Sequence, residues 1–260
     1  MVLLCAGCSA ADEGTSANVS VLLPPGDATP DYQLGGAYPP RPDVDVVTRD
    51  RRADPDPTRY SICYVNGFQT QPGERGLWPE ETLLHDGAHF VTDPDWPDET
   101  LLDTSESSRT AILKIVTPWI TGCADDGFDA VEFDNLDTYT RSNDALARED
   151  NLALAAAYVE IAHGAGLAAA QKNSAEDAAQ LQATAGFDFA VSEECAAFRE
   201  CNAYTDVYGT NVIDIEYDDA LPRSFAAMCA DPDTPGAVVL RDRQLSMPGE
   251  AAHVWATCTQ

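Results

Sequence analysis

Residues 127–137 read Gly-Phe-Asp-Ala-Val-Glu-Phe-Asp-Asn-Leu-Asp, an apolar run that ends in acidic and amide residues. The apolar residues within 128–133 predict a short buried strand. Before it, residues 105–125 carry apolar side chains at helical spacing, and after it residues 143–164 form an Ala- and Leu-rich stretch that ends in glycine. A strand between two helices is typical of parallel sheets whose strands are joined by crossover helices. This stretch therefore predicts an α/β fold.

The same alternation continues along the chain. Pro118 should kink or shorten the first of these helices, and Ser174 with Asp177 can cap a further helix that ends at Gly186. Short β-branched or aromatic runs predict eight strands, at residues 45–48, 61–65, 100–103, 128–133, 166–171, 187–192, 212–216 and 237–240. Residues 31–35 are a possible ninth strand ahead of the barrel. Eight such strands in 260 residues predict a single (β/α)8 TIM barrel.

An internal echo supports closure of this barrel. Residues 46–51 (Val-Val-Thr-Arg-Asp-Arg) and residues 238–243 (Val-Val-Leu-Arg-Asp-Arg) share five of six residues. They fall on the first and the last predicted barrel strands, which are neighbours in a closed barrel. An open, doubly wound sheet is the alternative, but no Gly-rich phosphate loop follows the first strand, so a nucleotide-binding version has little support.

Charge and cysteine content indicate an exported protein. The chain has 44 acidic and 15 basic residues, and its formal charge of −29 disfavours nucleic acid and anionic lipid and favours cationic partners. Solubility outside the cell is the simpler explanation of this acidity. Six of the eight cysteines are spread through the predicted domain, which suggests three disulfides and an oxidising compartment. They are Cys63, Cys123, Cys195, Cys201, Cys229 and Cys258.

The sequence of residues 1–30 predicts an export signal followed by a flexible tether. The pattern Cys5-Ala6-Gly7-Cys8 resembles a bacterial lipoprotein cleavage site with Cys8 as the lipidated residue, although Cys5 stands where Leu is usual and the preceding apolar run is short. Residues 9–30 are small and polar, as in disordered tethers. We therefore assign residues 31–260 to the barrel and expect the protein outside the cell or on its surface. A lipid anchor would be its membrane contact, because no later stretch is long and apolar enough to span a bilayer.

Polar side chains recur where the predicted strands end, which is where TIM barrels carry their reactive groups. They are Asp50, Tyr64, Asn66, Asp103, Glu132, Asp134, Asn135, Lys172, Asn173, Glu193, Glu194, Glu216, Tyr217 and Asp242. Strand alternation places Glu132 and Asp134 on one side, with Asp134 about 6.6 Å nearer the open end. Any one of these residues could merely cap a helix, and Glu132 could pair with Lys172 inside the barrel. As a set, carboxylates converging on one rim need a cationic ligand, a metal or shared protons.

Other chemistries find weaker support in the sequence. His85 and His89 have the spacing of a helical metal pair, but Gly87 between them argues for a loop. No EF-hand loop, His-Glu-x-x-His motif or Gly-x-Ser-x-Gly motif is present. Paired carboxylates remain, and these are the catalytic groups that most glycoside hydrolases use. We expect neither a metal nor a cofactor.

A set of motifs appears in order from about residue 31 to the C-terminus. They are Tyr32-Gln33-Leu34, Cys63-Tyr64-Val65-Asn66, residues 127–137, Gln171-Lys172-Asn173, residues 187–191 with Glu193 and Cys195, Ile215-Glu216-Tyr217, and Leu240-Arg241-Asp242-Arg243. Together they resemble glycoside hydrolase family 114, the endo-α-1,4-polygalactosaminidase type of TIM barrel. The resemblance implies cleavage within α-1,4-linked galactosamine-rich polysaccharide, a cationic or partly N-acetylated substrate.

The resemblance also implies an acidic pair. It places one acid at Asp134, after the fourth strand, and the other at the Glu of a Glu-x-Cys element after the sixth, which is Glu193 by spacing. Glu194 is the rival, because strand alternation lets only one of the two face the site. We expect Asp134 as nucleophile and Glu193 as acid/base of a retaining mechanism. The residues expected to shape the sugar subsites are Asp50, Tyr64, Lys172, Glu216 and Asp242.

We further predict the disulfides Cys63–Cys123, Cys195–Cys201 and Cys229–Cys258, one of fifteen possible pairings. Two other functions stay open: a glycan-binding lipoprotein that does not hydrolyse, and a hydrolase of another α-galactosidic polymer. The sequence leaves open the degree of substrate acetylation, endo or exo action and the oligomeric state.

Overall fold

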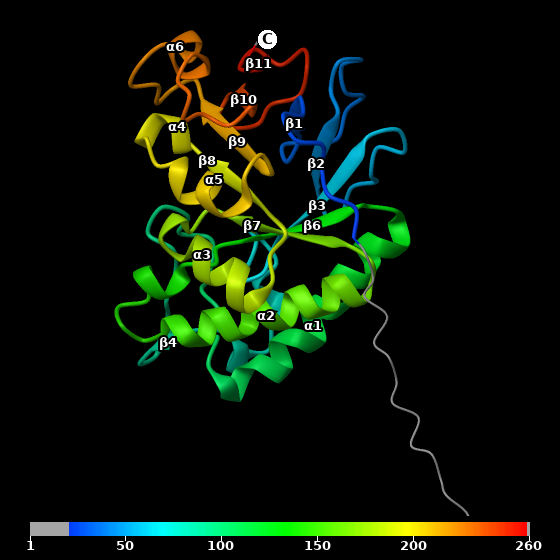
Figure 1. Cartoon of the computed structure of the whole chain (residues 1–260). Coiled ribbons are helices and arrows are strands. Elements are labelled where there is room, and N and C mark those ends of the chain that lie inside the picture. Colours follow the sequence, from blue (N-terminus) through cyan, green and yellow to red (C-terminus); the bar gives the residue numbers. More distant parts are fainter. Residues whose placement is uncertain (1–20, 259–260) are drawn as a thin grey trace, which may run out of the picture.

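The core of the molecule is a nearly closed barrel of parallel strands (Figure 1), seen in a computed structural model that describes residues 21–258. In spatial order the strands are β1 (Pro30–Tyr32), β2 (Val46–Asp50), β3 (Tyr60–Asn66), β6 (Ala130–Asp134), β7 (Ala168–Lys172), β8 (Phe189–Glu193), β9 (Val212–Tyr217) and β10 (Ala237–Arg241). Strand β11 (Trp255–Thr257) pairs with β10 in antiparallel orientation. The predicted α/β barrel is thus confirmed.

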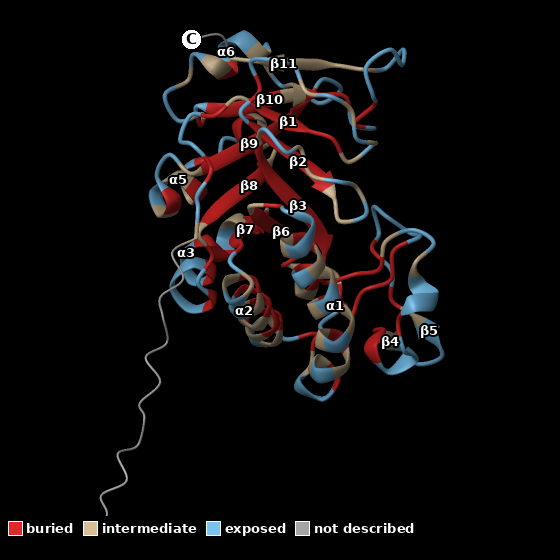
Figure 2. Ribbon diagram, turned by 90° about the vertical axis from the view of Figure 1, so that its right-hand side faces the viewer, coloured by how far each residue is buried: buried red, intermediate tan, exposed pale blue. Residues whose placement is uncertain are grey.

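Helices cover the barrel unevenly. The α-helices are α1 (Glu106–Asp126), α2 (Arg148–Gly164), α3 (Ala178–Gln180), α4 (Cys195–Phe198), α5 (Asn202–Tyr208) and α6 (Phe225–Cys229). Short helical turns lie at Arg75–Leu77, Glu80–Thr82, Thr138–Arg141, Ala175–Asp177 and Leu181–Ala185, and a small hairpin at β4 (His85–Asp86) and β5 (His89–Phe90). The long helices α1 and α2 pack side by side against β3, β6 and β7. Their inner faces are buried and their outer faces exposed (Figure 2).

The predicted strand at residues 100–103 is wrong. Thr100, Leu101 and Leu102 form isolated bridges within the long segment between β3 and α1, and both leucines are fully buried there. Strand β1 takes the missing place in the barrel by pairing with β2 in parallel. A short apolar run signals burial but not the partner that buries it. The two errors offset each other, so β6 is still the fourth barrel strand and β8 the sixth.

The seam of the barrel also differs from the prediction. Strand β1 lies between β2 and β10, so the two strands of the sequence echo are not neighbours. Each echo strand instead directs an arginine toward the β1 segment. Arg241 of β10 is fully buried and donates to Tyr32 O and to Asp31 Oδ1, while Arg49 of β2 donates to Gln33 Oε1 at 3.0 Å. The echo therefore reflects two similar contacts to one strand.

Two predicted helices differ in detail. Helix α1 continues through Pro118, which lies on its exposed side, where water can satisfy the carbonyl that loses its backbone donor. The region after Ser174 is divided into short turns, although it ends at Gly186 as predicted. The Ser174 hydroxyl donates to Asp177 instead of capping the backbone.

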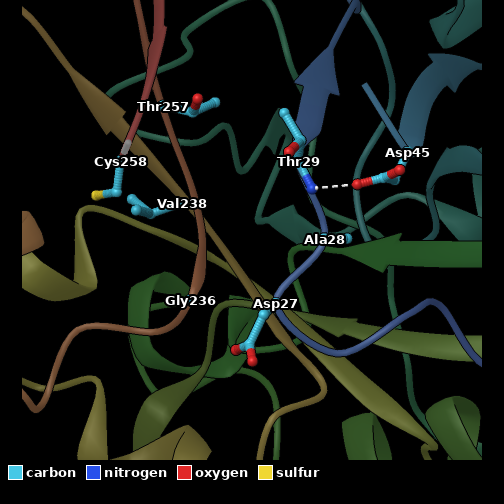
Figure 3. A pocket seen from close by; sticks show the side chains of 8 residues that line it. All are labelled: Asp27, Ala28, Thr29, Asp45, Gly236, Val238, Thr257 and Cys258. Carbon is cyan, nitrogen blue, oxygen red and sulfur yellow. Dashed lines mark hydrogen bonds between the residues drawn. The ribbon is translucent and has the colours of Figure 1, made fainter. Parts of the chain in front are cut away.

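Residues 21–29 lie against the N-terminal end of the barrel, just before β1. Ala28 is buried, and the Tyr60 hydroxyl donates to Leu22 O at 2.7 Å. A cavity of about 330 Å³ lies at this end. Among the residues that line it, Thr29 N donates to Asp45, and the side chain of Asp27 points away from this hydrogen bond (Figure 3). The predicted lipidation of Cys8 and the first part of the predicted tether fall within residues 1–20, outside the described part of the chain, and stay predictions. The last part of that tether does not fit the structure, because residues 21–29 lie against the barrel and Pro30 begins β1.

All three predicted disulfides are present. Cys63–Cys123 joins β3 to α1, Cys195–Cys201 closes a short loop after β8, and Cys229–Cys258 joins α6 to the segment after β11. Over residues 21–258, none of the helices combines the length and apolar character that crossing a membrane requires.

Candidate active site

A cleft of about 780 Å³ opens where the barrel strands end. Its wall includes both predicted catalytic residues and three of the five residues predicted to bind substrate. The structure thus brings together Asp50, Tyr64, Asp134, Lys172 and Glu193. This is the end of a TIM barrel at which catalysis is expected.

Asp134 is positioned by alternation along β6. Val131 and Phe133 pack outward into the core beneath the helices, which turns Glu132 and Asp134 into the barrel. Asp134 Oδ2 accepts a hydrogen bond from the Tyr64 hydroxyl at 2.7 Å, and its Oδ1 accepts from the backbone N–H of Asn135 at 2.8 Å. These donors fix the carboxylate at the mouth of the cleft.

Glu193, and not Glu194, faces Asp134. Phe189 and Val191 of β8 point into the barrel, and Glu193 follows them with the same parity. Its carboxylate accepts hydrogen bonds from Asn173 Nδ2 at 3.0 Å and from the Tyr217 hydroxyl. Glu194 has a left-handed backbone and turns to Arg243, 3.0 Å away. Of the two glutamates that strand alternation left open, Glu193 is thus the one that lines the cleft.

Lys172 lies between the two acids. It is almost completely buried, and its Nζ lies 3.8 Å from Asp134 Oδ2 and 3.5 Å from Glu193 Oε2. Because both oxygens neighbour one nitrogen, the sum of these distances limits their separation to about 7 Å. Burial alone would raise the pKa of Glu193, but Lys172 and the hydrogen bonds from Tyr217 and Asn173 hold it below its ordinary value.

Glu132 lies deeper in the barrel and is fully buried. Its Oε1 accepts from the Tyr32 hydroxyl at 2.6 Å and lies 3.4 Å from Lys172 Nζ. The pairing with Lys172 that the sequence offered as a structural alternative is thus present. Burial raises the pKa of Glu132 to about 7. Glu132 and Tyr217 were among the polar residues found at strand ends, and Tyr32 was part of a family motif, but none of the three was assigned a specific role from the sequence.

The structure does not bring Glu216 and Asp242 into the cleft. Glu216 lies on the outer face of β9 and accepts the backbone N–H groups of Ala196 and Ala197 at 2.9 and 3.0 Å. Asp242 is buried after β10, where it accepts Ser246 N at 3.0 Å and so closes a loop. Their predicted role in substrate binding does not fit these positions.

The β3–α1 segment adds residues to the rim that sequence reasoning missed. Its turn at residues 93–99, Asp-Pro-Asp-Trp-Pro-Asp-Glu, presents Trp96 with 58% of its surface exposed. Asp93 forms an ion pair with Arg141 at 2.6 Å, which fixes one end of the turn. Glu99 accepts from Gln69 Nε2 at 2.6 Å and fixes the other, and burial raises its pKa to about 7. A tryptophan among prolines and acids was the available signal.

Acidic groups outnumber basic groups around the cleft. The carboxyl side chains in its wall are Asp50, Asp93, Asp95, Glu99, Asp134, Asp137 and Glu193, and the cationic ones are Arg52, Arg141, Lys172 and Arg243. Each of these four cations has a carboxylate within 4 Å. The cleft is therefore suited to a ligand that carries positive charge.

Comparison with known proteins supports this description of the fold. The structure is similar to Ega3 of Aspergillus fumigatus in complex with galactosamine, with a TM-score of 0.72, 19% identity, and coverage of 89% of this chain and 98% of Ega3. It is also similar to the glycoside hydrolase domain of PelA from Pseudomonas aeruginosa, with a TM-score of 0.59, 14% identity, and coverage of 86% and 98%. No curated protein sequence is close enough to count as a match. The sequence profile of glycoside-hydrolase family GH114 matches residues 11–260, so the chain belongs to this family and is a glycoside hydrolase.

Proposed function

We propose that the enzyme cleaves α-1,4-linked galactosamine-rich polysaccharide, with Asp134 and Glu193 as its hydrolytic pair. The observation that carries this proposal is the meeting of both acids at Lys172 in a cleft whose wall holds seven carboxyl groups and four cations. Deacetylated galactosamine units carry an ammonium group, which such a wall attracts. The galactosamine bound to the similar protein Ega3 supports the same sugar class.

We propose further that the reaction retains anomeric configuration. Retaining glycosidases place their carboxyl groups about 5 to 5.5 Å apart, and inverting ones about 6.5 to 9.5 Å apart to admit a water. The limit of about 7 Å between Asp134 Oδ2 and Glu193 Oε2 covers the retaining distance and only the lower end of the inverting one. NMR of the first product should therefore show the configuration of the substrate, and inverted product would refute this mechanism.

The roles of nucleophile and acid/base can be assigned to these two residues in either order. The resemblance to the family implies Asp134 as nucleophile and Glu193 as acid/base. The lowered pKa of Glu193 favours the reverse assignment, because a nucleophile must be ionised while an acid must hold a proton.

Azide rescue of Asp134→Ala and Glu193→Ala distinguishes the two assignments. Azide that replaces a missing nucleophile attacks the substrate directly and gives a glycosyl azide of inverted configuration. In the acid/base variant, azide attacks the glycosyl-enzyme intermediate and gives a retained product. The variant that yields the inverted azide identifies the nucleophile.

The direct test of the substrate measures new reducing ends. The protein is incubated with deacetylated polygalactosamine, N-acetylated polygalactosamine and a neutral α-galactosidic polymer. We expect the fastest release from the deacetylated polymer. Preference for the neutral polymer would favour another α-galactosidase activity, and binding without product from any of the three would favour a glycan-binding protein.

We also propose that the protein is exported and is anchored to a membrane by a lipid on Cys8. The three disulfides support an oxidising compartment. Mass spectrometry of the N-terminal peptide from a bacterial membrane fraction should find a lipid on Cys8. An unmodified Cys8 in secreted protein would remove the anchor from this proposal and leave the export.

A further inference from the structure

A third carboxyl lies directly below the proposed hydrolytic pair, and the pair does not account for it. Glu132 precedes Asp134 by two residues on β6 and is fully buried. The Tyr32 hydroxyl donates to Glu132 Oε1 at 2.6 Å, and the Lys172 ammonium donates to the same hydroxyl oxygen at 2.9 Å. Glu132, Tyr32 and Lys172 therefore form one connected group, here named the basal triad.

Lys172 has more acceptors around it than hydrogens to donate. Its ammonium carries three N–H bonds. Four oxygens surround it, on Tyr32 at 2.9 Å, Glu132 at 3.4 Å, Glu193 at 3.5 Å and Asp134 at 3.8 Å. A hydrogen directed to Glu132 is therefore one that the hydrolytic pair does not receive.

Of the three carboxyl groups around Lys172, Glu132 is the one whose negative charge is stabilised by the fewest hydrogen bonds. Asp134 and Glu193 each accept two hydrogen bonds from neighbours other than Lys172. Glu132 accepts one such bond, and its buried Oε2 has no hydrogen-bond partner among the described residues. A buried carboxylate with so little compensation is less stable than the neutral acid.

Building on the hydrolytic pair proposed above, we propose that Glu132 is a positioning residue that stays protonated in the active enzyme and so leaves the charge of Lys172 to Asp134 and Glu193. Loss of its proton adds negative charge below the pair and draws the ammonium toward Glu132. The enzyme then loses activity, because Lys172 no longer holds Asp134 and Glu193 in place and no longer balances their negative charge.

The direction of the pH effect follows from the surrounding groups. Burial raises the pKa of Glu132 to about 7, and the charges of Asp134 and Glu193 raise it while Lys172 and Tyr32 lower it. The titratable groups around the basal triad, besides its own Tyr32 of β1 and Lys172 of β7, are Tyr64 of β3, Asp134 of β6, Glu193 of β8 and Tyr217 of β9. The pKa of each of these tyrosines and of Lys172 lies well above its ordinary value, so the charge of the basal triad changes at neutral pH through Glu132 alone.

The test compares the pH profile of kcat/KM in the parent enzyme and in Glu132→Gln. The parent should lose activity as pH rises through about 7. The amide keeps the shape of the side chain and is neutral at every pH. Glu132→Gln should therefore stay within a few-fold of the parent at pH 5 to 6, and its alkaline decline should move up by about one pH unit or more. An equal loss of activity at every pH would show a merely structural role and overturn the inference.

Glu99→Gln is the matched control. Glu99 also lines the cleft, and burial likewise raises its pKa to about 7, but it bonds to Gln69 and Asn66 and does not contact Lys172. We expect Glu99→Gln to retain the decline above pH 7. A decline that disappears in Glu99→Gln and persists in Glu132→Gln would assign the titration to the rim and overturn the inference.

A second readout does not depend on activity. The folded-state pKa of Glu132 is raised from 4.5 to about 7, so its contribution to stability is present below pH 4.5 and is lost as pH rises to about 7. The denaturation midpoint of the parent should fall relative to that of Glu132→Gln over this range and stay level above it. A constant difference between pH 5 and pH 8 would overturn the inference. A parent without activity on any galactosamine polymer would refute the proposed function instead.

Discussion

Two strands of the barrel carry a pair of acids two residues apart, and the pairs face opposite ways. Glu132 and Asp134 of β6 point into the barrel, where Lys172 lies within 4 Å of both. Asp214 and Glu216 of β9 point outward under α4, where both are fully buried. The inner pair lies next to a buried cation at the base of an open cleft. The outer pair is bonded to backbone N–H groups and is closed off from solvent.

The outer pair balances its charge in another way. Asp214 Oδ1 accepts from the Ser192 hydroxyl at 2.8 Å and from Cys195 N at 3.1 Å, yet its Oδ2 has no hydrogen-bond partner within residues 21–258. Burial and the neighbouring Glu216 raise the pKa of Asp214 well above its ordinary value. Both acids accept backbone N–H groups of α4 and so fasten this helix to β9. Identical spacing on a strand thus serves chemistry on one face and stability on the other.

The largest effect expected from this difference is on turnover. Asp134→Asn and Glu193→Gln should each lower kcat on the order of a thousandfold or more, because an amide neither attacks nor delivers a proton. Asp214→Asn, the matched change in the outer pair, should leave kcat within about threefold because Asp214 does not reach the cleft. Circular dichroism should show an intact fold in all three. An outer variant as inactive as the inner ones would break the comparison.

Removal of the inner cation tests why that pair tolerates its charge. Lys172→Met leaves three carboxyl groups without their shared ammonium, and breaking a buried ion pair costs about 3–5 kcal/mol. Against the effect of burial, Lys172 lowers the pKa of Glu193, and the stability that this contributes is lost as pH falls below the ordinary value of 4.5. The loss in Lys172→Met should therefore be larger at pH 7 than at pH 4. Urea denaturation at both pH values measures it. A loss that is equal at the two pH values would mean that Lys172 acts by packing alone.

The directions in which side chains point from these strands show which features could be predicted from the sequence and which could not. Seven of the eight barrel strands and all three disulfides were placed correctly. The two proposed catalytic acids lie in one cleft, and their role stays a prediction. Glu216 was assigned to the cleft because it ends a strand, but Tyr217 is the inward residue, and parity without a fixed register does not distinguish them. Leu101 and Leu102 were placed in the barrel because an apolar run does not name its partner. Trp96 was missed because a rim turn has no periodic pattern.

The outer pair should act on stability where the inner pair acts on turnover. Both outer acids have pKa values above their ordinary range, so their contribution to stability is present at acidic pH and is lost as pH rises. Glu216→Gln removes one titrating group and keeps an oxygen that accepts from Ala196 and Ala197. Relative to the parent, this variant should therefore be more stable at pH 8 than at pH 5. An unchanged difference between these pH values would show that the outer acids do not titrate between pH 5 and pH 8.

The smallest effect is expected at the rim, where the open face of the barrel meets its ligand. Trp96 is exposed on a turn that the Asp93–Arg141 ion pair holds in place, so its ring can receive a sugar ammonium at no cost in ordering the loop. Trp96→Ala should therefore raise KM roughly fivefold, equivalent to about 1 kcal/mol, and leave kcat nearly unchanged. Phe198→Ala is the control, because Phe198 is also a large exposed aromatic residue but lies on α4 outside the cleft wall. Steady-state kinetics on deacetylated and N-acetylated polymer separates two contributions, since only the former presents a cation to the ring. A rise in KM that is equal for both polymers would assign Trp96 to stacking against the sugar face, and a fall in kcat at constant KM would place it closer to the reacting bond than the rim.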